Sequence, residues 1–187
     1  MADKEDQLLN EQALVDDCLS GHTASFEGLV EKYQGPLFNA ALRMVHDYDE
    51  ARDITQAAFV RAYERLATYD SQYKFFSWIY RIMVNESLNV LQRNRRTTSL
   101  ETDIATNDSN PEVSYYQKEL GEQIQTELMN LAVDSRVILV LRHFADLSLH
   151  EIGYVLEIPE KTVKSRLFTA RERLRGRLVH RGIGRHS

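Results

Sequence analysis

The sequence predicts an all-α fold in which two small helical domains are joined by a flexible acidic linker and the C-terminal domain contains a helix-turn-helix. Apolar residues recur at spacings of three and four along most of the chain, which is the period of an amphipathic helix. Only three prolines occur, and no two-residue turn lies between alternating apolar runs, as a β-hairpin would require. Near the middle of the chain, a stretch rich in Ser, Thr, Asn and Asp interrupts the periodicity.

These observations divide the chain into four segments. We expect an acidic N-terminal extension over residues 1–22, a first helical domain over 23–96, a linker over 97–115 and a second helical domain over 116–187. The linker is too polar to offset its own ordering entropy. The expected helices, in chain order and before the helix-turn-helix, cover residues 14–19, 23–44, 49–66, 75–93, 117–131 and 135–144.

The composition excludes several classes of protein. No segment approaches the ~20 uninterrupted apolar residues of a membrane span, and the N-terminus lacks a signal-peptide pattern, so we expect a cytoplasmic protein without direct membrane insertion. A single cysteine, Cys18, excludes an internal disulfide and a multi-cysteine metal site. The six histidines are scattered, and there is no Gly-rich phosphate loop or nucleophile elbow. We therefore expect no metal, no cofactor, no small-molecule substrate and no enzymatic activity.

A tightly joined pair of helices is the clearest local pattern, within residues 147–178. Ser148 and Glu151 have the S-x-x-E spacing of a capping box, in which the hydroxyl accepts from the Glu151 amide and the glutamate reaches back. Pro159 cannot extend the first helix, but it suits the first turn of the second. A short helix followed by a basic helix has the shape that enters a DNA major groove.

The second helix of this pair has an apolar face and a polar, basic face. Its apolar stripe consists of Val163, Leu167, Ala170 and Leu174. The other side carries small polar groups and an aromatic ring flanked by cations: Lys161, Lys164, Ser165, Arg166, Phe168, Thr169 and Arg171. Such a face can meet base edges, with Phe168 on a thymine methyl and the cations on phosphates. The alternative is a solvated helix whose charges bind nothing specific.

The charge is unevenly distributed along the chain. The formal net charge is -5, yet residues 160–187 hold nine Lys and Arg against two Asp and Glu, and residues 61–98 hold seven against three. The intervening segments are acidic. Two basic islands indicate two surfaces for phosphates, while the acidic segments should weaken binding of the isolated chain to DNA.

A second informative stretch, residues 69–96, begins with closely spaced aromatic residues and ends with arginines. Aromatic rings beside a basic helix can receive unstacked bases, because single-stranded recognition combines stacking faces with cationic tracks. The alternative is that Phe75, Trp78, Ile79 and Ile82 belong to the core and that the arginines form a solvated helix end.

Taken together, these segments resemble the sigma factors of bacterial RNA polymerase, in particular the extracytoplasmic-function (ECF) group of the sigma-70 family. Residues 51–66, 75–89 and 148–167 are similar to the second conserved helix, the promoter-melting helix and the -35-reading helix-turn-helix of that family. The chain departs from the family at Arg52 and Ala57, where acidic residues are common. It also lacks the glycine often found in the loop that reads the -10 element.

The resemblance implies that residues 23–96 are sigma region 2 and that the second domain is sigma region 4. It implies binding to core RNA polymerase and promoter-specific initiation, with the -35 element read as duplex DNA and the melted -10 strand captured. An anti-sigma factor is an implied partner, and a stress response an implied setting. The implied -35 contacts are the seven residues of the basic face given above. The implied -10 contacts are Tyr73, Lys74, Phe75, Phe76, Trp78, Arg81, Asn85 and Arg93. The implied contacts to core polymerase are Asp53, Gln56 and Phe59.

One alternative remains open on the residues alone. The chain could be a conventional helix-turn-helix transcriptional regulator that binds a duplex operator through its second domain. The two possibilities differ in whether specific DNA binding requires core RNA polymerase.

Overall fold

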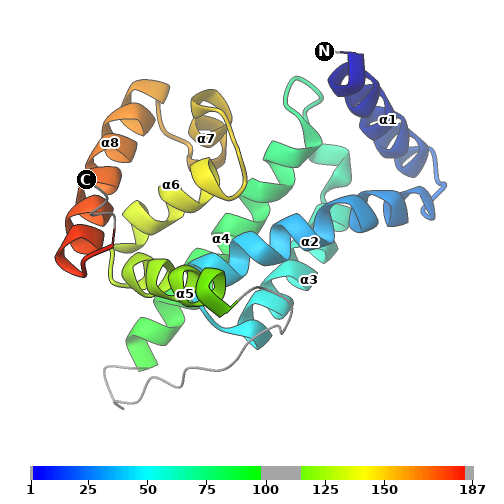
Figure 1. Cartoon of the computed structure of the whole chain (residues 1–187). Coiled ribbons are helices and arrows are strands. Elements are labelled where there is room, and N and C mark those ends of the chain that lie inside the picture. The colour runs from blue at the N-terminus through cyan, green and yellow to red at the C-terminus, as the bar shows by residue number, and fades with distance from the viewer. Residues whose placement is uncertain (1, 98–114, 184–187) are drawn as a thin grey trace.

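The computed structural model describes residues 2–97 and 115–183, with side chains for residues 11–96 and 121–183. Over these ranges the chain forms eight α-helices, one 3-10 helix and no strand, which confirms the all-α prediction (Figure 1). In chain order the elements are α1 (Ala2–Leu19), α2 (Ser25–Val45), α3 (Tyr48–Glu64), η1 (Leu66–Thr68), α4 (Phe75–Thr97), α5 (Tyr115–Met129), α6 (Val133–His143), α7 (Leu149–Leu156) and α8 (Glu160–His180). The predicted linker lies almost entirely outside the described residues.

Helices α1 to α4 form the first module. Helices α2, α3 and α4 pack against one another around the buried side chains of Leu29, Leu37 and Ile79. Asp47 caps the N-terminus of α3, and its carboxylate accepts a hydrogen bond from the Glu50 amide at 2.8 Å. This bond satisfies one of the amides that have no partner within the helix. A regular, rigid three-helix core therefore positions the aromatic stretch that precedes α4.

Helix α1 is longer than the helix predicted for residues 14–19, and it packs on α2. The buried carboxylate of Glu11 lies 2.5 Å from Lys32 Nζ and accepts a hydrogen bond from the Tyr33 hydroxyl. Burial, followed by the hydrogen bond to Glu11, raises the pKa of Tyr33 above its ordinary value. Polar side chains thus attach the acidic N-terminal segment to the first module.

Helices α5 to α8 form the second module. Helix α6 is its buried centre, with Ile138, Val140 and Leu141 fully enclosed. At the far end of α8, the buried carboxylate of Glu127 on α5 forms ion pairs with Arg177, at 3.0 Å, and with Arg181. These ion pairs fix the C-terminal turns of α8 against α5.

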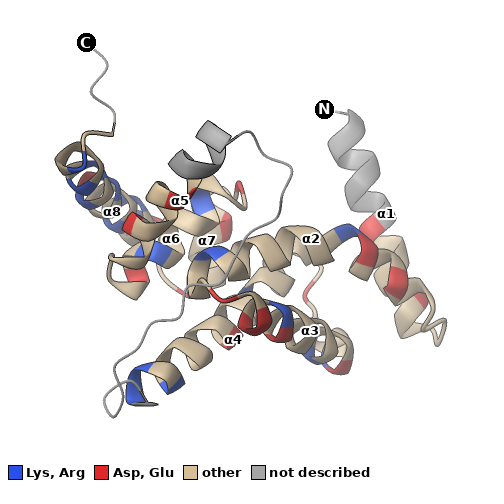
Figure 2. Cartoon of the chain, turned by 60° about the horizontal axis from the view of Figure 1, so that its bottom comes forward, with Lys and Arg blue, Asp and Glu red and all other residues tan. Residues whose placement is uncertain are grey.

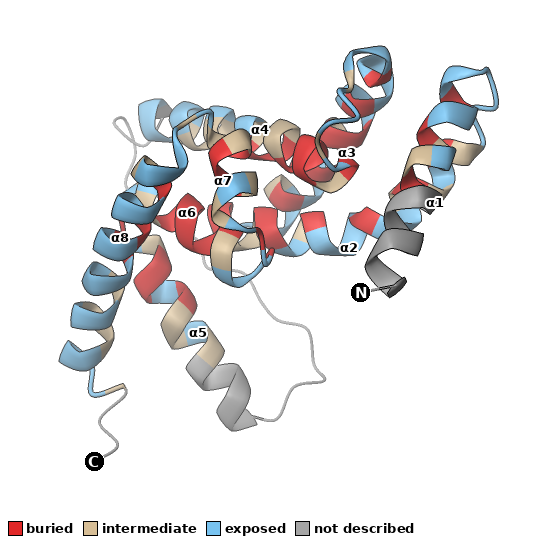
Figure 3. Ribbon diagram, turned by 90° about the horizontal axis from the view of Figure 1, so that it is seen from above, coloured by how far each residue is buried: buried red, intermediate tan, exposed pale blue. Residues whose placement is uncertain are grey.

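The two modules pack directly on each other, an arrangement that the sequence did not predict. Helix α7 lies against α4, and α5 and α6 lie against α2 (Figure 3). Arg43 of α2 donates to the Gln125 side chain at 3.1 Å, and its guanidinium lies 4.7 Å from the centroid of the Phe144 ring. The buried residues consequently form one continuous core across both modules.

Candidate nucleic-acid interface

The outer face of α8 is the basic face that the sequence predicted. All seven residues proposed for the -35 contact are exposed: Lys161, Lys164, Ser165, Arg166, Phe168, Thr169 and Arg171. Val163, Leu167 and Ala170 face inward and are at most 3% exposed. Phe168 is 67% exposed, although an aromatic ring at the surface gains nothing from the core. The placement leaves the ring available for a partner.

A tight turn between α7 and α8 sets the position of this face. The predicted capping box is present, with Ser148 Oγ accepting from the Glu151 amide at 3.2 Å and Glu151 accepting from the Ser148 amide at 2.8 Å. Glu157 ends α7 in the left-handed region at φ 54°, and the Ile158 amide donates to the Gly153 carbonyl at 3.0 Å. A Cβ at Gly153 would lie 3.0 Å from the Ile158 carbonyl oxygen. A side chain at position 153 would therefore crowd the turn, although the sequence analysis did not single this residue out.

Arg171 is oriented by a histidine of α6. Its Nε donates to His143 Nε2 at 3.2 Å, so His143 acts as an acceptor and is neutral. Partial desolvation of the His143 side chain, then the positive charges of Arg171 and Arg142, hold the pKa of His143 below its ordinary value. His143 thereby holds one of the proposed phosphate-contacting side chains without carrying a competing charge.

Several aromatic side chains before and within α4 belong to the core. Phe75 is 1% exposed and Trp78 is 7% exposed, with ring centroids 5.6 Å apart. Tyr69 packs on both rings, and burial, followed by nearby acidic groups, raises the pKa of Tyr69 to about 12. Phe75 and Trp78 are therefore core residues in this structure, as the alternative interpretation expected. In this conformation their rings pack beneath the loop on the core side. Their contact with a base stays a prediction.

The loop before α4 is held in shape by local hydrogen bonds. The Asp70 carboxylate accepts from the Gln72 amide at 2.9 Å, and the Asp70 carbonyl accepts from the Tyr73 amide at 3.0 Å. The Tyr69 hydroxyl donates to the Tyr73 carbonyl at 2.6 Å. Tyr73 and Lys74 consequently project from a fixed loop rather than from the helix itself.

The remaining residues proposed for the -10 contact lie along α4 at or near the surface. Asn85 and Arg93 are exposed, whereas Phe76 and Arg81 are partly buried. Arg93 lies 3.8 Å from the Glu50 carboxylate. Figure 2 shows Lys and Arg positions along α8 and at the C-terminal end of α4, so the two basic islands of the sequence lie in two separate parts of the molecule.

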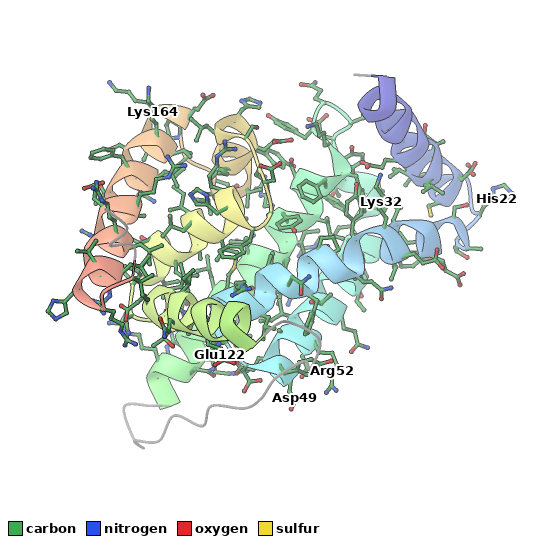
Figure 4. All side chains as sticks on the ribbon, in the orientation of Figure 1. His22, Lys32, Asp49, Arg52, Glu122 and Lys164 are labelled. Atoms are coloured by element: carbon green, nitrogen blue, oxygen red, sulfur yellow. The ribbon has the colours of Figure 1, made fainter. Side chains whose placement is uncertain are left out.

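Helix α3 carries the residues proposed to contact core polymerase. Asp53 and Gln56 are exposed, but Phe59 is 8% exposed and packs edge-on against Phe26. Two apolar residues missed by the sequence analysis continue the exposed stripe at spacings of four and three: Val60, 52% exposed, and Tyr63, 47% exposed. Figure 4 shows Asp49 and Arg52 of α3 far from Lys164 of α8. The α3 stripe and the basic face of α8 are therefore separate surfaces.

The described residues contain neither a candidate metal cluster nor a membrane-spanning helix. No three His, Cys, Asp or Glu side chains in residues 2–97 and 115–183 come together as a candidate metal site. None of the helices within these ranges is both long and apolar enough to cross a bilayer. Cys18 is buried, and burial raises the pKa of its thiol, which favours the unreactive protonated form.

Comparisons with known proteins match both modules. The sequence model "Sigma-70 region 2" matches residues 29–97, and "Sigma-70, region 4" matches residues 128–176. The RNA polymerase sigma-H factor of Pseudomonas aeruginosa is 33% identical over 87% of this chain and 90% of its own length. The ECF RNA polymerase sigma factor SigW of Bacillus subtilis is 32% identical over 84% of this chain and 91% of its own length. The solved structure of the sigma factor RpoE in complex with the anti-sigma factor NepR, from Bartonella quintana, covers 82% of this chain and 96% of the matched chain, with a TM-score of 0.67 and 19% identity.

Proposed function

The chain belongs to the extracytoplasmic-function group of the sigma-70 family, and on this basis we propose that it binds core RNA polymerase in the cytoplasm and directs it to specific promoters. The observation that carries the proposal is the ordered pair of regions 2 and 4, in which region 4 exposes the basic face of α8 and region 2 combines aromatic rings with cations before and along α4. The proposed mechanism contains no covalent chemistry.

The -35 element is read as duplex DNA by α8. Its exposed residues enter the major groove, where Ser165, Phe168 and Thr169 face base edges. The cations at the edges of the same face, among them Lys164 and Arg171, contact phosphates, which fix the register. His143 supports this arrangement by holding Arg171 in place.

The -10 element is captured as a single strand by the loop before α4 and by the surface of α4. Flipping a base out of the duplex costs a few kcal/mol, and stacking on an aromatic ring returns ~1–3 kcal/mol per base. Tyr73 offers a partly exposed ring, which is stacked on Tyr154 in this conformation, and Lys74 and Arg81 offer charge for the backbone. Phe76, Asn85 and Arg93 extend this surface, while the buried Phe75 and Trp78 hold the loop from behind.

Helix α3 is the proposed contact with core polymerase. Its exposed stripe combines Asp53 and Gln56 with the apolar Val60 and Tyr63, and this mixture of polar and apolar groups suits a protein partner. Phe59 stabilises α3 from the inside. An anti-sigma factor is a further proposed partner, because a structure of similar fold contains one. Co-purification of a small inhibitor with the tagged chain would test that partner.

Run-off transcription with core RNA polymerase tests the proposal. A library of fragments from the genome that encodes this chain is transcribed with and without the full chain. We expect new transcripts that begin at a common distance from a shared pair of sequence elements. Sequence-specific DNA binding by the chain without core polymerase, together with unchanged transcription, would instead support a conventional operator-binding regulator.

A further inference from the structure

Helix α1 lies beside the loop proposed to capture the -10 strand, although it precedes residues 29–97, the segment that matches sigma region 2. It packs on α2 and also contacts η1, the 3-10 helix that leads directly into this loop at Tyr69. The sequence analysis assigned no function to this acidic helix. The contacts of one of its side chains, Glu11, connect it to the proposed -10 surface.

Glu11 holds Tyr33 of α2 by its hydroxyl group. Both residues are buried, with Glu11 7% exposed and Tyr33 5% exposed. One carboxylate oxygen of Glu11, Oε1, accepts hydrogen bonds from the Tyr33 hydroxyl and from the Lys32 ammonium. A buried carboxylate is costly unless such donors satisfy it. The positions of the Glu11 carboxylate and the Tyr33 hydroxyl are therefore tied to each other.

The ring of Tyr33 packs on the first two residues of α4. Its centroid lies 5.8 Å from that of Phe75 and 5.6 Å from that of Phe76. Phe75 in turn packs on Tyr69 and Trp78 at the base of the loop. Tyr33 is thus fixed at both ends, by a hydrogen bond at its hydroxyl and by aromatic contacts at its ring.

Glu11 also acts on Tyr69. Burial, followed by the negative charge of Glu11, raises the pKa of Tyr69 to about 12, which favours the protonated hydroxyl. This hydroxyl donates to the Tyr73 carbonyl at 2.6 Å. The same carboxylate thus supports two tyrosines beneath the loop, one by a direct hydrogen bond and the other through its charge.

We propose that Glu11 is a positioning residue for capture of the -10 strand, acting through Tyr33 on the rings of Phe75 and Phe76, which directly follow the loop. This inference rests on the proposed function of that loop. A loop that is already ordered loses less conformational freedom when it takes up an unstacked base, so capture of the strand is favoured. The acidic N-terminal helix therefore contributes to promoter opening without contacting DNA.

The fluorescence of Trp78 tests the structural part of the proposal, because Trp78 is the only tryptophan in the chain and is 7% exposed. Tyr33→Phe keeps the ring but removes the hydroxyl, and Glu11→Leu removes the acceptor. Loss of this hydrogen bond should make locally open conformations about three- to ten-fold more populated. Acrylamide quenching of Trp78 in the free chain should rise in both variants. Unchanged quenching in both would show that Glu11 does not act on the base of the loop, and would overturn the proposal.

Permanganate footprinting tests the functional part, with the full chain bound to core RNA polymerase on a promoter found by run-off transcription. Glu11→Leu and Tyr33→Phe should each lower the reactivity of thymines in the melted region about three- to ten-fold, while binding to core polymerase stays unchanged. The double variant should be no worse than the more affected single variant, because both changes remove the same hydrogen bond. Unchanged reactivity in both single variants, or additive losses in the double variant, would overturn the proposal.

Two further variants separate positioning from a general structural effect. Glu31→Leu is the matched control, because Glu31 is exposed and lines the same surface hollow as Glu11; it should change neither readout. Glu11→Gln keeps an acceptor for the Tyr33 hydroxyl and should retain most of both readouts, which a merely space-filling role of Glu11 would not produce. Losses in Glu11→Gln or in Glu31→Leu as large as those in Glu11→Leu would contradict the positioning role. Circular dichroism checks that each variant is folded, and Tyr33→Phe, the smallest change, carries the test if Glu11→Leu does not fold.

The two proposals fail in different ways. Normal promoter opening by every variant would remove the role of Glu11 and leave the proposed function standing. If the unmodified chain opened no promoter with core polymerase, the proposed function would fail and the role of Glu11 with it. The Trp78 readout in the free chain would in that case still report the contact between α1 and the base of the loop.

Discussion

Arg136 of α6 donates from Nη1 to the Met44 carbonyl in the last turn of α2, 2.6 Å away, and so joins the two modules by a buried cation. Its Nη2 donates to the Met129 carbonyl at the end of α5, at 2.9 Å. Burial lowers the pKa of Arg136, yet the guanidinium lies at the negative ends of two helices, which favours its charge. Arg136 therefore satisfies carbonyls from both modules at once.

Replacing this arginine should destabilise the protein. Arg136→Met keeps a long apolar stem but leaves the Met44 and Met129 carbonyls without their donor, which should cost about 1–3 kcal/mol of the free energy of unfolding. Arg175→Met is the control, because the Arg175 side chain is 76% exposed, and its effect should stay within about 0.5 kcal/mol. Urea unfolding followed by circular dichroism measures both. Equal effects of the two changes would contradict a structural role for Arg136.

Two adjacent residues of α8 should separate DNA recognition from stability. Phe168→Ala should leave the free energy of unfolding nearly unchanged, because the ring is 67% exposed, but should lower transcription from a -35-dependent promoter about ten-fold. Leu167→Ala, at a 3% exposed position, should cost about 2–5 kcal/mol of stability. Thermal unfolding and run-off transcription with core polymerase provide the two readouts. Full promoter activity of Phe168→Ala would remove this ring from the proposed interface.

The turn between α7 and α8 should be sensitive to a single methyl group. In Gly153→Ala the new Cβ would meet the Ile158 carbonyl at 3.0 Å, so the turn must shift, at a cost of about 1–3 kcal/mol. Gly176→Ala is the matched control, because nothing lies within 4 Å of its Cβ position on α8, and it should stabilise the helix by about 0.4–1 kcal/mol. Opposite signs of the change in unfolding free energy are expected. A Gly153→Ala variant with an unchanged free energy of unfolding would show that the turn accommodates the methyl group.

The free energy of unfolding should fall as the solution becomes acidic, because protonation of His143 is less favourable in the folded chain than in the unfolded chain. Its folded-state pKa lies below the ordinary value of 6.5, so between the two values the unfolded chain binds the proton and the folded chain does not. The contribution is fully present above pH 6.5 and is lost as the pH falls through the lowered pKa. His143→Gln, which keeps an acceptor for Arg171 but cannot be protonated, should flatten this dependence. Urea midpoints compared from pH 8 to pH 5 measure this dependence, and an unchanged dependence in His143→Gln would contradict the role given to His143.

Local sequence signals predicted much of the fold and the exposed basic face of α8. The apolar stripe of α8 and the capping box at Ser148 depend on neighbours one turn away, so their spacing in the chain is enough to identify them. Helix α1 was predicted too short, because its first turns are too polar to show an apolar period. Gly153 gave no signal, because its role depends on the close approach of the Ile158 carbonyl in three dimensions.

Burial within the aromatic stretch and the packing of the modules could not be predicted from spacing. Phe75 and Tyr73 are two residues apart, but Phe75 is buried in the core and Tyr73 is partly exposed. This difference depends on where the loop ends and α4 begins. The Lys74–Glu151 and Arg81–Glu157 pairs join residues more than seventy positions apart. Charges so far apart in a chain with many charges of both signs carry no pairing information in the sequence.

The attachment of Arg177 and Arg181 to Glu127 has a consequence for promoter choice. Helix α8 is 21 residues long, or about 30 Å, and these ion pairs hold the end opposite the turns that are proposed to face DNA. A tilt of about 5° at that anchor would displace the opposite end by nearly 3 Å, roughly the separation of neighbouring base pairs. Substitutions in the last turn, remote from any nucleotide, can thus alter which sequence is favoured by changing the angle at which the helix is presented.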